Sequence, residues 1–85
     1  MSLTPTELKN EIEKSLGIMR TLRDEVRVKL HLASMDVKDE WRQLEPNLAD
    51  VERTASEFTE ATRTALAEAV KHLSRLRSRL TRGDE

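Results

Sequence analysis

Apolar residues recur along this chain at steps of three and four positions, which is the spacing of one face of an α-helix. This main stripe begins near the N-terminus and continues almost to the end of the chain. It consists of Leu8, Ile12, Leu16, Met19, Leu22, Val26, Leu30, Ala33, Val37, Trp41, Leu44, Leu48, Val51, Ala55, Phe58, Thr62, Ala65, Ala69, Leu73, Leu76 and Leu80. The pattern predicts an all-α protein, and we expect these positions, Thr62 apart, to form its core.

Two signals in the sequence set the expected helix boundaries. Thr4-Pro5-Thr6-Glu7 fits a capping box with proline at the first helical position. The strongest interruption is Glu45-Pro46-Asn47, because proline disfavours helical angles at the residue before it and asparagine can cap a new helix. We therefore expect a single domain, 1–85, that is an antiparallel hairpin of two helices, 5–44 and 47–82, with its turn at Glu45, Pro46 and Asn47.

The alternative to the hairpin is one long helix that is kinked at Pro46. Leu44, Leu48 and Val51 keep the spacing of the main stripe across the proline, and no glycine marks a turn there.

A second set of small and apolar residues faces away from the main stripe in the first half of the chain. It comprises Gly17, Thr21, Val28, Leu32 and Met35. One stripe lets a helix pack against one neighbour, so a second stripe requires another partner. We expect these residues to form an interface between copies of the chain, with two hairpins pairing as a four-helix bundle held by coiled-coil-like packing.

Composition narrows the class of protein. Charged residues make up 36% of the chain, the net charge is −1, and there is one Trp, one Phe and no Cys. The absence of cysteine excludes a disulfide framework and thiol chemistry. No apolar run of signal-peptide or membrane-span length is present, so we expect a cytoplasmic protein.

The last part of the chain carries the most concentrated charge. Lys71, Arg75, Arg77, Arg79 and Arg82 follow one another without an intervening acidic residue. Such a segment can bind nucleic acid, an anionic membrane or an acidic partner. A hairpin would place it beside Glu7, Glu11 and Glu13, and it contains no aromatic residue to stack on bases. We therefore expect it to have a structural role and expect no nucleic-acid partner.

Enzyme chemistry has little support in the sequence. His31 and His72 fall on different predicted helices, and Glu68 with His72 is an incomplete metal-binding set. No serine is accompanied by a histidine and an acid in a recognisable motif, and no glycine-rich phosphate loop is present. We expect no catalytic residues, no metal and no cofactor.

Two resemblances bear on function. The chain is similar in size to a small secreted family of helical hairpins that carries Trp-x-Gly at its turn, but its own triplet is Trp41-Arg42-Gln43, so that family is not assigned. The amphipathic helices with a proline break also resemble apolipoprotein-type lipid binders, in periodicity alone. We expect a non-enzymatic interaction protein that associates with itself. The first alternative is a lipid-surface-binding protein, although we do not expect the chain to bind membranes. The second alternative is a protein that binds nucleic acid or an acidic partner through the basic segment.

Overall fold

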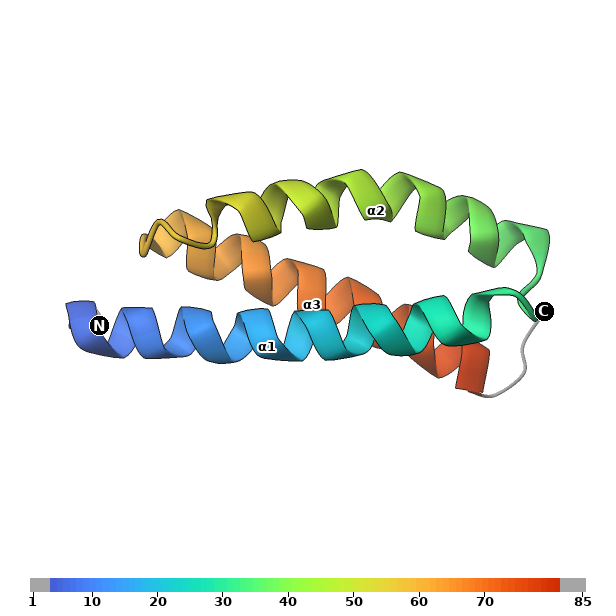
Figure 1. Cartoon of the computed structure of the whole chain (residues 1–85), viewed down its shortest axis with the longest axis horizontal. Coiled ribbons are helices and arrows are strands. Elements are labelled where there is room, and N and C mark those ends of the chain that lie inside the picture. The colour runs from blue at the N-terminus through green and yellow to red at the C-terminus, as the bar shows by residue number, and fades with distance from the viewer. Residues whose placement is uncertain (1–3, 82–85) are drawn as a thin grey trace.

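The computed structural model describes residues 4–81, which form three α-helices and no strand. They are α1 (Pro5–Leu30), α2 (Met35–Thr54) and α3 (Glu60–Thr81). The all-α class is therefore confirmed. The helices run up, down and up in an elongated bundle of 43 × 21 × 19 Å (Figure 1).

Ion pairs between helices fix their relative directions. Glu11 and Glu25 of α1 pair with Arg63 and Arg77 of α3, so residue numbers rise together and the two helices are parallel. Arg23 and Arg27 of α1 instead pair with Glu52 and Glu45 of α2, in reversed order, so α2 is antiparallel to α1. The packing between α1 and α3 is the most extensive in the bundle.

The predicted start of the first helix is confirmed. The Thr4 hydroxyl accepts a hydrogen bond from the Glu7 amide (3.1 Å), and the Glu7 carboxylate accepts one from the Thr4 amide (3.0 Å). Pro5 occupies the first turn, where its missing N–H costs nothing. This capping box fixes where α1 begins.

The two predicted helices are wrong as elements, because the chain reverses at 31–34 and 55–59 and not at 45–47. Ser34 caps α2, with its hydroxyl accepting from the Val37 amide (3.4 Å). Thr59 does the same for α3, accepting from the Thr62 amide (3.1 Å). A dimer of this chain would therefore contain six helices, not the four of two paired hairpins. Arg82, the predicted end of the second helix, lies outside the described residues.

The predicted turn at Glu45, Pro46 and Asn47 lies inside α2. A proline within a helix removes one backbone hydrogen bond, here the one to the Arg42 carbonyl. Pro46 and Arg42 are both exposed, so water can satisfy that carbonyl. The alternative of one long helix is also wrong, since the chain folds back on either side of α2.

The hydrophobic pattern gives no sign of the two turns, because the main stripe continues through both of them. Ala33 is partly buried against the core and Ala55 is 5% exposed, so each turn contributes one covered residue to the main stripe. The helix-ending residues His31 and Ala55 keep right-handed angles (φ −65° and −67°), so neither turn needs a glycine. The stripe therefore continues across two chain reversals.

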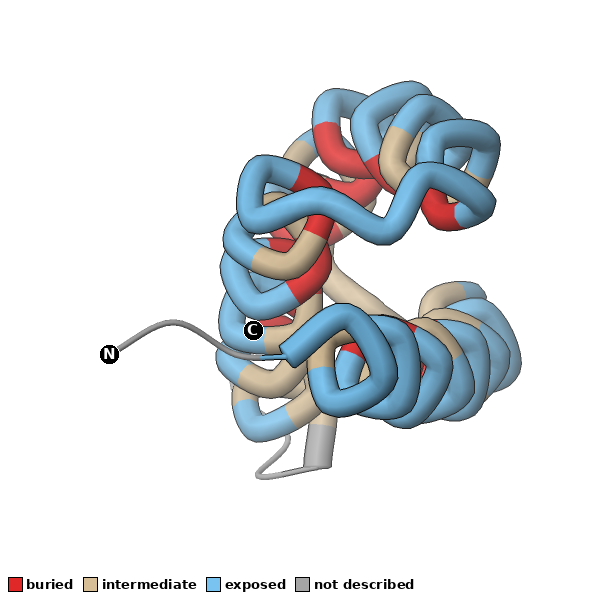
Figure 2. Tube along the Cα trace, turned by 90° about the vertical axis from the view of Figure 1, so that its left-hand side faces the viewer, coloured by how far each residue is buried: buried red, intermediate tan, exposed pale blue. Residues whose placement is uncertain are grey.

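The main stripe forms the core, and in Figure 2 the buried segments of the three helices face inward. The fully buried side chains include Ile12, Met19, Val26, Val37, Leu48, Leu73 and Leu76, whereas Leu8, Leu16, Leu30, Ala33, Val51 and Leu80 are partly buried against them. Leu22, Trp41, Leu44 and Ala69 are also buried in this cluster, and Ala65 is half-buried. Leu66 also belongs to the core and Val70 packs against it, although neither is part of the main stripe. Phe58 was wrongly placed in the core: it lies in the second turn and is 40% exposed.

The revised helix boundaries predict opposite effects of substitutions at Pro46 and Ser34. Pro46→Ala should stabilise the protein by about 1–3 kcal/mol, because proline is unfavourable in a helix interior. Ser34→Ala should destabilise it by about 1 kcal/mol through loss of the cap. Urea unfolding measures both. Asn47→Ala is the control: it costs stability if Asn47 caps a helix, and gives a gain of a few tenths of a kcal/mol inside α2.

Candidate interaction surface

Arginine and glutamate side chains join α1 to α2. Arg20 Nε lies 2.6 Å from Glu52 Oε2, and Arg23 Nη1 lies 2.9 Å from Glu52 Oε1. One turn further along α1, Arg27 Nη2 lies 3.0 Å from Glu45 Oε2. Direct contact between these two helices is sparse compared with that between α1 and α3. The long arginine side chains therefore span a separation that the apolar residues do not close.

Glu52 is the charged centre of this α1–α2 contact. The hydrogen bond from Arg20 is the largest cause of a lowered pKa of the Glu52 carboxyl relative to its usual value of 4.5, and Arg23 adds to it. Partial burial of Glu52 opposes the shift. Arg23 is the least exposed of the three arginines (20%), and its Nε makes no hydrogen bond to the described residues.

The basic segment was predicted to lie beside Glu7, Glu11 and Glu13, and this prediction is wrong. Because α3 is parallel to α1, its C-terminal half lies against the later turns of α1 and the first half of α2. Arg77 pairs with Glu25 (3.5 Å), and Arg79 forms an ion pair with Glu40. The hairpin expectation failed because it assumed antiparallel neighbours.

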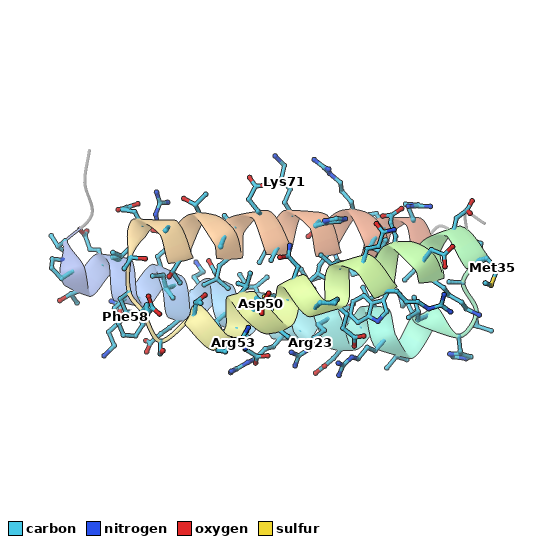
Figure 3. All side chains as sticks on the ribbon, turned by 90° about the horizontal axis from the view of Figure 1, so that it is seen from above. Arg23, Met35, Asp50, Arg53, Phe58 and Lys71 are labelled. Carbon is cyan, nitrogen blue, oxygen red and sulfur yellow. The ribbon has the colours of Figure 1, made fainter. Side chains whose placement is uncertain are left out.

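The remaining basic residues of the segment do not converge on a ligand site. Lys71 and Arg75 are exposed, make no ion pair with the described residues, and border a hollow of about 300 Å³ between α2 and α3. In Figure 3 the Lys71 side chain points away from the other two helices. Arg82 lies outside the described residues. Part of the predicted patch is therefore neutralised by α1 and α2, and part is scattered on the surface.

The predicted interface residues are all exposed. Val28 is 70% exposed, Leu32 78% and Met35 62%, and Gly17 and Thr21 also face solvent. Ile18, at 42% exposed, extends this surface and was missed because it lies about 60° around the helix from Thr21, between the two stripes. We call Gly17, Ile18, Thr21, Val28, Leu32 and Met35 the outer face.

The N-terminal half of the outer face is hollowed. A depression of about 510 Å³ is lined by Gly17, Ile18, Thr21 and Leu22 and is bordered by Glu25 and by Arg77 of α3. A Cβ added at Gly17 would meet nothing within 4 Å. The fold of a single chain therefore does not require glycine there. The other half of the outer face, by contrast, carries the exposed side chains of Val28 near the end of α1, Leu32 in the first turn and Met35 at the start of α2.

Trp41 is 5% exposed and lies beneath the first turn, beside Leu30 and His31. Among residues 4–81, no three His, Asp or Glu side chains are grouped as a metal site would require. His72 Nε2 lies 3.9 Å from Glu40, which is an ion pair only when the imidazole is protonated. No helix within the described part of the chain is long and apolar enough to cross a membrane.

Comparisons of the chain with protein-family models, curated proteins and solved structures found no match.

Replacing Glu52 should make the protein less sensitive to acid. The folded-state pKa of Glu52 is lower than its unfolded value, so the ion pairs stabilise the fold above about pH 4.5 and lose this effect as the pH falls through the folded-state pKa. Glu52→Gln should lower stability at pH 7 by about 1 kcal/mol and flatten its decline below pH 4.5. Urea unfolding at several pH values measures this. Glu68→Gln, which removes a carboxylate that has no ion pair to the described residues, should leave the profile unchanged.

The basic segment should not bind nucleic acid at physiological salt. Two of its arginines are paired with glutamates, and its other charges do not form a continuous surface. We expect no DNA or RNA complex tighter than about 10 µM, which is weaker than specific complexes typically are. A gel-shift titration with mixed-sequence DNA and RNA tests this. A sub-micromolar complex that weakens steeply with salt would show that phosphate recognition is a function of this chain.

Proposed function

We propose that this chain is a non-enzymatic interaction protein that associates with further copies of itself through the outer face. The observation that carries the proposal is the exposure of three large apolar side chains, Val28 of α1, Leu32 of the first turn and Met35 of α2, each more than 60% accessible. Burying an apolar side chain of this size stabilises a complex by about 1.5–3 kcal/mol. Three such residues, exposed between positions 28 and 35 of the chain, are a substantial driving force for association.

The bundle itself does not need a partner to bury its main stripe. Ile12, Met19 and Val26 are fully covered by α2 and α3 of the same chain. What remains exposed is the outer face, which combines one side of α1 with Leu32 of the first turn and Met35 of α2. Association therefore adds to a folded monomer, and monomers and dimers should interconvert with protein concentration.

Charged substitutions on the outer face should abolish association. The double variant Val28→Glu/Leu32→Glu should be a monomer, because each chain would bring two carboxylates into an apolar contact. Its melting temperature should be lower than that of the unmodified protein and independent of concentration, since the stabilisation by association is lost. Light scattering gives the mass and circular dichroism gives the melting curve.

The control is Ala61→Glu/Ala67→Glu, which adds the same charge at two exposed positions of α3. This variant should remain a dimer. If the unmodified protein is a monomer at tens of micromolar, or if the control dissociates as readily as the outer-face variant, the proposed function is wrong.

A further inference from the structure

The outer face has two unlike halves, and this asymmetry limits how two copies can pair. One half is the hollow over Gly17, and the other carries the protruding side chains of Val28 and Leu32. Glycine in a helix interior is unfavourable relative to alanine, and here the space above it is open. The residue thus weakens the helix without serving the packing of its own chain.

Building on the proposed self-association, we infer that two copies pair through α1 in an antiparallel, two-fold arrangement. Val28 of each copy occupies the hollow over Gly17 of the other, and the second copy of this chain is the occupant of the outer face. A two-fold interface brings the same surface of both subunits together, so one half of the face must complement the other half. A hollow and a protrusion on the same face meet this condition when the helices are antiparallel.

The spacing of the two halves agrees with this arrangement. Gly17 and Val28 are eleven residues apart, which is about three turns, so both point in nearly the same direction from α1. Both residues lie within α1, so the helical geometry holds between them. The hollow, at about 510 Å³, has room for the Val28 side chain.

Charges beside the face also favour the antiparallel arrangement. With Val28 opposite Gly17, Arg20 of one copy lies within one residue of the level of Asp24 of the other. Both are exposed. A parallel pair would place Arg20 opposite Arg20 and Asp24 opposite Asp24, so like charges would meet. The helix dipoles also favour the antiparallel pair.

Filling the hollow should weaken the dimer and at the same time make the monomer more stable. Gly17→Leu should weaken the dimer about tenfold or more, because the leucine takes the place of the incoming Val28. In the monomer the same substitution meets open space and improves helix propensity, so the dilute protein should melt at a higher temperature. A dimer of unchanged affinity would contradict the inference.

Disulfide trapping tests the direction of pairing, since the chain contains no cysteine of its own. Gly17→Cys and Val28→Cys are made separately, and one carries a tag so that the two differ in mass. An oxidised equimolar mixture should give the mixed disulfide. Each variant alone should remain uncrosslinked, because identical positions in an antiparallel pair lie about 16 Å apart, beyond the reach of a disulfide.

The outcomes distinguish this inference from the proposed function. Self-crosslinking of each variant alone would show a parallel pair, and a dimer that gives no disulfide would show a different interface; either result overturns the inference and leaves self-association standing. If the unmodified chain is a monomer at tens of micromolar, both are overturned.

Discussion

The parallel packing of α1 against α3 is the interaction on which the rest of the structure depends. These two helices make the most extensive contact in the bundle, and ion pairs at both ends, Glu11–Arg63 and Glu25–Arg77, hold them in register. Parallel neighbours in one chain need a connecting segment that spans the full length of the pair. That segment is α2, which closes the core with Val37, Trp41 and Leu48 and returns the chain to the starting end.

Apolar and charged residues contribute differently to the contacts between the helices. Leucine, isoleucine, valine and methionine fill the space between α1 and α3, whereas arginines reach from α1 to the glutamates of α2. Surface ion pairs individually contribute little, because water screens them and ordering the side chains costs entropy. Two arginines converge on Glu52 and a third on Glu45, so these pairs add to the placement that the buried Val37 and Leu48 give to α2.

Gly17 connects the fold to the proposed function. Internal packing gives no reason for a glycine at this position, since a side chain there would meet open space. The hollow lies near the middle of α1, and the exposed Val28 lies eleven residues further along the same helix. The two ends of this helix face therefore differ from each other. A surface of this kind favours one way of pairing over another, which a stripe of identical apolar residues would not do.

The sequence by itself determined the all-α class, the capping box that starts α1, most of the core, and the exposed second stripe. All of these are local, since they follow from helical spacing or from hydrogen bonds within one turn. Only the tertiary structure decided where the chain reverses. Ala33 and Ala55 keep the stripe continuous through both turns, and Pro46 is tolerated because its side of α2 faces water. The basic end of α3 likewise meets Glu25 and Glu40 because three helices, not two, place it there. Local spacing is identical for two long helices and for three short ones, and only packing between distant residues separates them.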